Sequence, residues 1–575
     1  MVEGDRACCV VGCKTLIVTI IISLAVSLPA ILSGYVIDDL VFTSPMYRPE
    51  MPFGYYHYID EMRRLDVLPW WAANNLEINF FRVLSSASLY LDFHLGRDIP
   101  LFAHLHSALW FVVLLLGAAR LIGALVQHPW QRKWAFVIFA LGSYHAFAVG
   151  FIATRHALMG GTFAVWAAAM YLEWHRDQDR KWFIAAMLLF FLGLLSGETA
   201  FAFAGFAFAH DLFFVEGNLR RKLMVFFPVG LAAAAYLLFY STMGFGPEGS
   251  GMYVNPLTSP VDFLAAVPGK VLSMVGAFTL GVPAHLRMAE GLEGVPVWAG
   301  AIGLGLSLPV LLLAWKHLLG NEKRLIKWSS VMGLLTMAPG LSGITSGRAV
   351  SMSGIAFSVI MAIALSAIRF APLSKARKRI ARPLAVMVVL GLLFLAPLSR
   401  LVQSHIMINW GSILTTKLAG TAPLPCEESA SVYVINGDFL TAYYAPFLVA
   451  KSPEQFRDSW HELVSTNSDI TVRRDGPDIL RITGESNSLI GPMSFDLFTN
   501  SRTALPEGTV IDKDGLSVSV EKRSARGPTA LSFSIPDLEN PLMVCLLTLR
   551  NYAFEPFPLP RPGQTVTVPY QQPKP

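Results

Sequence analysis

The sequence is poor in charged residues and in cysteine. Of its 575 residues only 15% are Asp, Glu, Lys or Arg, and five are Cys, whereas an average soluble chain has about 25% charged residues. So few cysteines exclude a disulfide-rich scaffold, and the scarcity of charge argues against a disordered chain. Because 54% of the residues are hydrophobic, more than a soluble enzyme of this length would bury, the composition predicts a membrane protein.

The apolar residues are gathered in long runs. A transmembrane helix needs about 20 mostly apolar residues, and runs of about this length recur between Thr15 and Leu401. They predict a polytopic α-helical membrane protein with about eleven spans. The segment Val261–His285 contains two prolines and a lysine, so we interpret it as interfacial or re-entrant.

The distribution of Lys and Arg predicts the orientation, because cytoplasmic loops retain basic residues. With the N-terminus inside, the inner loops hold 21 Lys and Arg and the longer outer loops hold 10. An odd number of spans then leaves the C-terminal part outside. We therefore expect a multi-pass protein of a bacterial inner membrane with a cytoplasmic N-terminus and a periplasmic C-terminal domain.

The C-terminal part differs from the rest of the chain. Residues from Ile406 on carry a net charge of −4, against +9 for those before. Short segments rich in Val, Ile, Thr and Leu predict strands, with Asp514-Gly515 as a hairpin turn between two of them and Glu454–Val464 as a helix. The expected strands are Ser431–Asn436, Asp469–Arg473, Asp478–Thr483, Gly508–Asp512, Leu516–Glu521, Ala530–Ile535, Leu542–Leu549 and Thr565–Pro569.

These patterns predict two domains. Residues 1–405 are expected to form a transmembrane module that includes a first outer loop over residues 35–98. Residues 426–575 are expected to form an extracytoplasmic domain of the α+β or β-sandwich class. Within the outer loop, Tyr55–Leu68 has the spacing of an amphipathic helix on the bilayer surface, and Trp70 and Trp71 are expected to be interfacial anchors.

Two adjacent carboxylates, Asp38 and Asp39, directly follow the first span. Ionisable groups at a membrane boundary are costly unless they are solvated or used. Because neighbouring carboxylates repel each other, one of them can keep a raised pKa and act as a general base. The alternative is a solvated helix end that marks the membrane surface.

Other ionisable residues fall at outer helix ends and outer turns of the predicted topology. Each one alone is better explained by structure than by chemistry, but their common side of the membrane favours a site. They are Arg82, His104, His106, Arg155, His156, Glu198 and Arg348.

The order of these segments resembles the membrane module of GT-C fold glycosyltransferases, nearest to the protein O-mannosyltransferase branch and its bacterial family-39-like relatives. The similarity covers about Thr15 to Arg400 and rests on five short motifs, some of them altered. The matching segments are Asp38-Asp39, Arg82-Val83-Leu84-Ser85, Ala153-Thr154-Arg155, Ser196-Gly197-Glu198-Thr199 and Arg348-Ala349-Val350-Ser351-Met352-Ser353-Gly354-Ile355-Ala356-Phe357.

The resemblance implies a hexosyl- or pentosyltransferase that takes sugar from a polyprenyl phosphate on the outer face and inverts the anomeric centre. Asp38, with Asp39 beside it, would be the general base. The guanidinium groups of Arg82, Arg155 and Arg348 would bind the donor phosphate. The residues expected to position the acceptor or to be structural are Glu198, His104, His106 and His156.

The expected partners are membrane lipid, the polyprenyl-phosphate sugar and a protein, lipid or polysaccharide acceptor, with no nucleic acid. No cluster in the sequence calls for a metal or cofactor, so none is expected. Two alternatives stay open. A transporter or flippase of lipid-linked sugars would have mid-span charges and an inverted repeat, and the sequence shows neither. A non-catalytic homologue would bind glycan or a partner protein through its C-terminal domain.

The cysteines divide into two groups. Cys8, Cys9 and Cys13 lie at the predicted inner N-terminus, where we expect free thiols. Cys426 and Cys545 lie in the predicted outer domain, near its opposite ends. An oxidising compartment would allow this pair to form a disulfide, which requires Cα atoms within about 7 Å. The alternative is two free thiols, with Cys545 buried in a strand.

Overall fold

The structure is a computed structural model of the whole chain. It describes residues 11–44, 47, 54–96, 99–256, 259–289, 291–427, 430–449, 460–484, 488–500 and 505–570. These residues divide into two compact units. Unit 1 comprises Met1–Gly34, Phe81–Phe245 and Asn255–Ile408, and unit 2 comprises Tyr35–Phe80, Gly246–Val254 and Asn409–Pro575.

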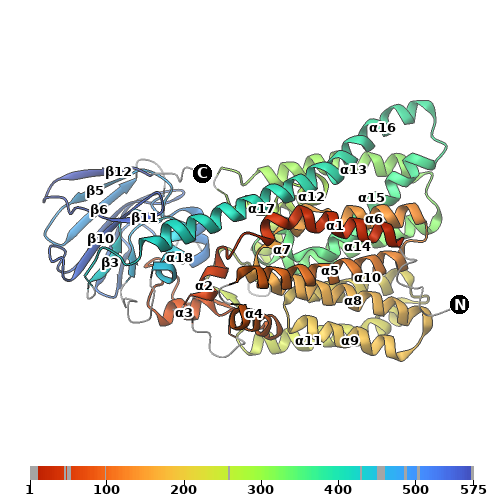
Figure 1. The fold of residues 1–575 in the computed structure, drawn as a ribbon, viewed down its shortest axis with the longest axis horizontal. Helices are drawn as coiled ribbons and strands as arrows, with labels where there is room; N and C mark the ends of the chain where they lie inside the picture. The colour runs from red at the N-terminus through yellow and green to blue at the C-terminus, as the bar shows by residue number, and fades with distance from the viewer. Residues whose placement is uncertain are drawn as a thin grey trace. The chain divides into compact units, whose positions relative to one another are not determined.

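Unit 1 is a bundle of helices (Figure 1). Within it α8 packs against α5, α9 and α10, and α15 packs against α6 and α14. The longer helices are α1 (Cys13–Ile31), α4 (Val83–Gly96), α5 (Pro100–Leu125), α6 (Pro129–Ala140), α8 (Arg155–Asp177), α9 (Arg180–Leu194), α10 (Ala202–Phe214), α11 (Leu219–Thr242), α12 (Pro260–Thr279), α13 (Val295–Trp315), α14 (Gly320–Leu341), α15 (Ser351–Phe370), α16 (Lys375–Leu390) and α17 (Ala396–Ser412).

Short helical segments join these helices. They are η2 (Ser143–His145), α7 (Ala146–Gly150), η3 (Ile152–Thr154), η4 (Glu198–Phe201), η5 (Ala284–Met288), η6 (Gly347–Ala349) and η7 (Gly391–Leu395). Three of them, η3, η4 and η6, directly precede α8, α10 and α15. The sequence motifs around Arg155, Glu198 and Arg348 therefore fall at the starts of three helices.

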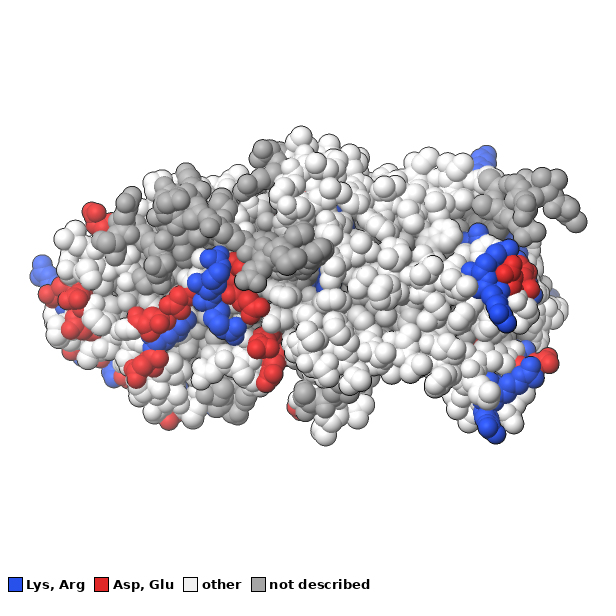
Figure 2. Space-filling model, turned by 90° about the horizontal axis from the view of Figure 1, so that it is seen from below, with Lys and Arg blue, Asp and Glu red and all other residues white. Residues whose placement is uncertain are grey.

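The chain is a multi-pass helical membrane protein. Seven helical segments in the described part of the chain are long and apolar enough to cross a bilayer. Helix α11 shows why the apolar residues are there: Leu223, Phe227 and Leu238 are between 45% and 67% exposed, which suits a lipid-facing surface. Charged side chains are sparse over the helices of unit 1 (Figure 2). The seven segments are Cys13–Ile31, Pro100–Leu125, Leu219–Thr242, Pro260–Thr279, Val295–Trp315, Ser351–Phe370 and Lys375–Thr421.

The expected number of about eleven spans stays a prediction. It depends on α12, because counting this helix as a span would change the number of spans. By length and composition α12 qualifies as a span. However, a Cβ atom on Gly300 would meet Leu272, and one on Gly303 would meet Thr279, so α12 and the next helix, α13, run in the same direction. Successive spans must alternate in direction, so this pairing agrees with a re-entrant or interfacial segment.

Unit 2 contains two sheets and several short helices. The first sheet has the order β11-β10-β3-β4, with β3, β4 and β10 parallel to one another. The second has the order β12-β5-β6-β9-β8-β7 and is antiparallel. The strands are β3 (Ser431–Val434), β4 (Trp460–Glu462), β5 (Ile470–Arg474), β6 (Ile479–Gly484), β7 (Val510–Lys513), β8 (Leu516–Ser524), β9 (Gly527–Ser534), β10 (Val544–Arg550), β11 (Ala553–Pro556) and β12 (Thr565–Val568).

All eight expected strands of the C-terminal part are present in this unit, which makes it an α+β domain. Asp514 and Gly515 have φ values of 50° and 82° and join β7 to β8, as a type I′ hairpin requires. The expected helix Glu454–Val464 is wrong in its last part, because Trp460–Glu462 forms β4; its first residues lie outside the described part. The helices are α2 (Asp38–Thr43), α3 (Tyr58–Arg64), α18 (Phe439–Val449) and α19 (Pro492–Phe498), with η8 (Ile413–Leu418) and η9 (Ala419–Thr421).

The first outer loop packs within unit 2, although we expected it with the membrane module. A two-stranded sheet pairs β1 (Glu77–Asn79) with β2 (Gly246–Glu248). Trp70 and Trp71 are 4% and 3% exposed, and their Nε1 atoms donate to Leu463 O at 3.0 Å and Ser494 O at 3.4 Å. Both tryptophans are therefore core residues of unit 2, and the prediction of interfacial anchors is wrong.

The expected helix in this loop is also different from the prediction. Helix α3 is only seven residues long. Its Tyr58 ring stacks on Tyr443 with centroids 4.4 Å apart, and the Tyr58 hydroxyl donates to Tyr443 O at 2.7 Å. The apolar face of α3 is thus covered by protein. An amphipathic pattern fits a bilayer surface and a domain core equally well, and the structure has the second.

Cys426 and Cys545 form a disulfide, with Cα atoms 5.7 Å apart. The pairing follows from the sheet: β10 holds Cys545 beside Val432 of β3, and Cys426 lies just before β3. The bond therefore ties the segment before β3 to a strand 119 residues later.

Cys13 is also disulfide-bonded, contrary to the expectation of a free thiol.

Candidate functional site

Arg155 is the first residue of α8 and is completely buried. Its guanidinium forms an ion pair with the equally buried Asp92 of α4. It also donates to Ala103 O at 2.7 Å, to Ser88 Oγ at 3.0 Å and to Ser107 Oγ at 3.1 Å. These contacts favour a structural role for Arg155, and the phosphate-binding role expected from the motif stays a prediction. Arg155 joins α8 to α4 and α5.

The two histidines of α5 take part in the same packing. His106 Nδ1 lies 2.8 Å from Asp92 Oδ1, and Trp110 Nε1 donates to His106 Nε2 at 3.2 Å. His104 is fully buried and its Nε2 lies 2.7 Å from Gly34 O. Of the two roles expected for these histidines, the contacts favour the structural one.

Arg82 and Glu198 form an ion pair although 116 residues separate them. Arg82 Nε donates to Glu198 Oε2 at 3.0 Å, and the Tyr240 hydroxyl donates to Glu198 Oε1 at 3.1 Å. The side chains of Arg82 and Glu198 remain 11% and 26% exposed. The pair therefore lies at the surface of unit 1 and is accessible in part.

Backbone contacts hold the turn that carries Glu198. Leu84 N donates to Leu195 O at 2.8 Å, which connects the start of α4 to this turn. A Cβ atom on Gly197 would lie 3.0 Å from His156 O. At this distance a side chain would press on the backbone of α8, which favours a glycine in this motif.

Two arginines and two histidines gather around this turn in unit 1. His156 interacts electrostatically with both Arg82 and Arg348, and His285 interacts with Arg348. Arg348 is half-buried in η6, and the gap that it lines with Gly161, Thr199, Ser351 and Met352, among others, is too small to admit a water molecule. The structure thus brings together Arg82, His156, Glu198 and Arg348, four of the residues expected at the site.

Asp38 and Asp39 belong to unit 2, where they open α2. Asp39 is 0% exposed, and its Oδ2 accepts a hydrogen bond from Val36 N at 3.3 Å. Asp38 is only half-buried, and its Oδ1 accepts a hydrogen bond from the Tyr444 hydroxyl at 2.6 Å. The two carboxylates therefore differ in environment, and Asp38 is the more accessible one.

The partner of Asp38 was not visible in the sequence. Tyr444 lies on α18, 406 residues after Asp38, and no motif connects them. Burial, and then the Asp38 carboxylate, raise the pKa of Tyr444 well above its usual value. The phenol therefore remains protonated and continues to donate to Asp38. An O–H group donating to a carboxylate makes a strong, charge-assisted hydrogen bond that fixes the orientation of the carboxylate.

A buried acid pair lies at the carboxyl ends of the parallel strands β3 and β4. Burial raises the pKa of Glu462 well above its usual value, with a further contribution from Asp438. Burial also raises the pKa of Asp438. The Thr441 hydroxyl lies 3.1 Å from Glu462 Oε1, and the Tyr552 hydroxyl donates to Asp438 Oδ2 at 2.8 Å. Sequence reasoning missed this pair, because single acidic residues after strands are common.

No family model and no curated protein matches this chain. Similar solved structures include the oligosaccharyltransferase of Archaeoglobus fulgidus tethered with an acceptor peptide, with a TM-score of 0.42 and 13% identity over 80% of this chain. ArnT from Cupriavidus metallidurans bound to undecaprenyl phosphate has a TM-score of 0.38 and 13% identity over 76%. The arabinofuranosyltransferase AftD from Mycobacteria has a TM-score of 0.40 and 14% identity over 91%.

These three proteins are GT-C fold membrane glycosyltransferases, the class that the sequence motifs resemble. The chain spans 64% of the oligosaccharyltransferase chain, 86% of the ArnT chain and 41% of the AftD chain. Because every TM-score lies below 0.5, these similarities assign no residue roles in this chain.

Proposed function

We propose that the protein is a membrane glycosyltransferase that takes a hexosyl or pentosyl group from a polyprenyl phosphate on the outer face of a bacterial inner membrane. The observation that carries this proposal is the pair of arginines, Arg82 and Arg348, that lie near His156 in unit 1, just before α4 and α15. Their helices belong to a membrane bundle, so they suit an anion that is attached to a lipid. The five motifs of the sequence support the same reaction.

Arg348 is the residue we assign to the donor phosphate. It is half-buried and lies within electrostatic reach of His156 and His285. A guanidinium presents several N–H donors in a plane and matches phosphate oxygens better than an ammonium group does. Negative charge grows on the phosphate as the sugar leaves, so the cation stabilises the transition state more than the ground state.

Arg82 is assigned a secondary role in phosphate binding, because its guanidinium is already paired with Glu198. Glu198 and Tyr240 hold Arg82 at the surface of the bundle, and the exposed part of Arg82 adds positive charge for the phosphate. Glu198 is thus a positioning residue. Arg155, which is buried against Asp92, is left out of the phosphate site that the motifs suggested.

Asp38 is assigned as the general base and Asp39 as its structural support. Asp38 would take the proton of an acceptor hydroxyl, whose oxygen then attacks the anomeric carbon. The bond from that carbon to the phosphate oxygen breaks, and the polyprenyl phosphate leaves with the electron pair. Attack opposite the leaving group inverts the anomeric centre. The acceptor is a protein, lipid or polysaccharide hydroxyl.

The test measures transfer of labelled sugar in membranes that contain the full-length protein. The membranes are supplied with polyprenyl-phosphate hexose and, separately, with polyprenyl-phosphate pentose. We expect Asp38→Asn to abolish transfer, because an amide cannot accept the proton. Asp60→Asn is the matched control, since Asp60 lies in the same outer loop but is exposed and pairs with Arg63. Wild-type transfer by correctly inserted Asp38→Asn protein would refute the role of Asp38.

Arg348 is tested separately by binding. Arg348→Gln should weaken the binding of undecaprenyl phosphate to the purified protein, and Arg348→Lys should restore part of it. Equal binding by the wild type and Arg348→Gln would contradict the phosphate site. A wild-type protein that binds the lipid or a glycan and transfers no sugar would favour the non-catalytic alternative.

A further inference from the structure

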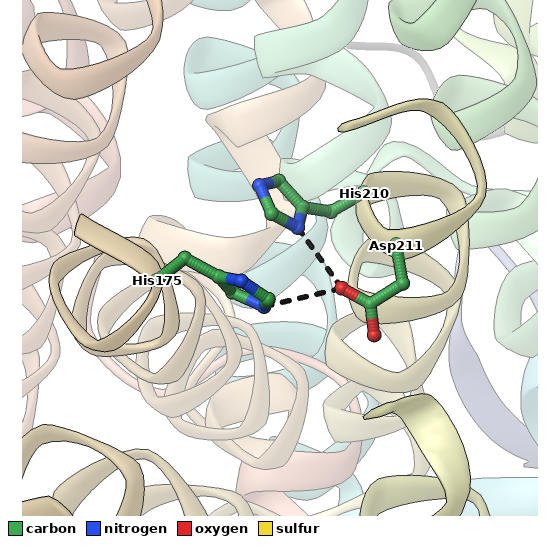
Figure 3. Close-up of side chains that lie close together, drawn as sticks. All are labelled: His175, His210 and Asp211. Atoms are coloured by element: carbon green, nitrogen blue, oxygen red, sulfur yellow. Dashed lines mark hydrogen bonds and ion pairs between the residues drawn. The ribbon is translucent and has the colours of Figure 1, made fainter. Parts of the chain in front are cut away.

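A second cluster of ionisable side chains lies in unit 1, at the ends of α8 and α10 that are opposite to the proposed site. His175 is in the last turn of α8, and His210 and Asp211 are in the last turns of α10 (Figure 3). One potential ligand atom from each residue lies within 4.8 Å of the others. His210 and Asp211 are 7% and 1% exposed. The side chain of His175 is 18% exposed, so the cluster is buried at α10 and partly exposed at α8.

The distances within the cluster suit a metal ion. His175 Nε2 lies 3.2 Å and His210 Nδ1 lies 3.0 Å from the same atom, Asp211 Oδ1. Two ligands on a tetrahedral zinc ion, with bonds of about 2.0–2.1 Å, are separated by about 3.3 Å. For the three atoms to share one ion, the two histidine nitrogens, which lie within 4.8 Å of each other, would have to be about 3.3 Å apart.

Hydrogen bonding alone does not account for His175. Its Nε2 atom is buried, and it is not aligned for a hydrogen bond with any group in the described part of the chain. Figure 3 shows this nitrogen directed toward the Asp211 carboxylate. This nitrogen is thus paired with the carboxylate at 3.2 Å but makes no aligned hydrogen bond with it. A metal ion between the two groups would satisfy both.

The surroundings provide the second shell that a metal site needs. The Tyr171 hydroxyl donates to Asp211 Oδ2 at 2.7 Å, which orients the carboxylate and leaves Oδ1 as the ligand atom. The guanidinium of the neighbouring Arg324 donates to Phe213 O at 2.9 Å. This hydrogen bond holds the arginine on a backbone carbonyl and not on a ligand of the cluster. The rings of Phe206 and Phe214 cover His210.

We propose that His175, His210 and Asp211 bind a zinc ion. Two imidazole nitrogens and one carboxylate oxygen suit zinc among the biological divalent cations, and a water molecule or a fourth group would complete the tetrahedron. The ion would fasten the end of α8 to the end of α10. The same helices begin at Arg155 and just after Glu198, so the site would brace the elements that carry His156 and Glu198.

The sequence did not reveal this site, because 35 residues separate His175 from His210 and neither belongs to a metal-binding motif. Its residues are also distinct from those proposed for sugar transfer. The zinc site can therefore be tested without a sugar substrate. A failure of either proposal leaves the other unaffected.

The experiment measures zinc retained by the purified full-length protein in detergent. The protein is stripped with a chelator, equilibrated with zinc chloride, desalted and analysed for zinc per chain. We expect Asp211→Asn to hold one zinc fewer than the wild type, because an amide is a weak ligand of similar shape. His128→Gln is the control for loss of a histidine; His128 is exposed at the start of α6, and this variant should retain zinc like the wild type.

Two further measurements protect the test from variants that fold badly. Zinc should raise the midpoint of thermal unfolding of the stripped wild type and His128→Gln, and have a smaller effect on Asp211→Asn. Cobalt should bind the wild type with the visible absorption of a tetrahedral N/O site and be displaced by zinc. The proposal is overturned if the wild type and Asp211→Asn retain equal zinc, or if zinc leaves the wild-type midpoint unchanged.

Discussion

The buried ion pair between Asp92 and Arg155 offers the sharpest prediction about stability. Both side chains are 0% exposed. Asp92→Ala removes the counter-charge and leaves the guanidinium enclosed in unit 1. A buried charge without its partner is costly, because it has lost its hydration and gains little in return. We therefore expect Asp92→Ala to be among the most destabilising substitutions in this unit.

The contacts of Arg155 set the magnitude. Removing one partner of a buried ion pair costs about 3–5 kcal/mol. In Asp92→Ala the guanidinium keeps its hydrogen bonds to Ala103 O, Ser88 Oγ and Ser107 Oγ, which compensate for part of the loss. We therefore expect a decrease of about 3 kcal/mol in the free energy of unfolding. Such a decrease lowers the equilibrium constant for folding about 150-fold, since each 1.4 kcal/mol is a factor of ten.

The assay is reversible unfolding of the purified protein in mixed micelles with increasing denaturing detergent, followed by far-UV circular dichroism. Asp60→Ala serves as the control, because its pair with Arg63 is exposed and such pairs contribute about 0–1 kcal/mol. The double variant Asp92→Leu, Arg155→Met contains neither charge, so no buried charge is left unpaired. It should be more stable than Asp92→Ala.

Two results would refute this reasoning. A loss below about 1 kcal/mol for Asp92→Ala would mean that Arg155 finds water or another counter-charge. If the double variant is no more stable than Asp92→Ala, then lost side-chain packing, and not the unpaired buried charge, causes the decrease in the free energy of unfolding.

Three other predictions concern unit 2. Cys545→Ser should destabilise it by up to about 4–5 kcal/mol, because the disulfide with Cys426 closes a loop of 119 residues; denaturation under non-reducing conditions measures this, and a loss equal to that of reduced wild type is expected. Burial raises the pKa of Glu462. The stability that the protonated carboxyl contributes to the folded state is therefore full at low pH and is lost as the pH rises through the folded-state pKa. Glu462→Gln should therefore gain thermal stability relative to wild type as pH is raised from 5 to 9, and parallel curves would contradict the assignment. Tyr444→Phe should lower sugar transfer about tenfold, because a hydrogen bond to a charged group is worth about 1.5–3 kcal/mol and this one orients Asp38; an unchanged rate would exclude that role.

Apolar runs and alternating patterns were enough to predict much of the fold. Long apolar runs can be satisfied only in lipid or in a large core, so helices such as Pro100–Leu125 and Ser351–Phe370 followed from composition alone. The strands of unit 2 were visible for a similar reason, because β-branched alternation suits few other structures. The Asp514-Gly515 turn was predicted from φ preferences that few residue pairs meet.

Patterns that suit more than one environment led to errors. The amphipathic helix α3 and the pair Trp70 and Trp71 have a side that must be covered, but the sequence does not say whether lipid or protein covers it. The structure covers them with residues of unit 2. The motif arginines posed the same problem: Arg155 and Arg348 looked alike in the sequence, and only packing buried the first against Asp92.

The candidate sites divide in the same way. The sequence by itself determined the residue types: an acidic pair after the first span, arginines at helix starts, and cysteines in one outer domain. Only the tertiary structure decided which of them meet, because hydrogen bonds and ion pairs require atoms within about 3 Å and chain distance carries no such information. Arg82 meets Glu198 across 116 residues and Asp38 meets Tyr444 across 406, and the packing of helices and strands alone brings these pairs together.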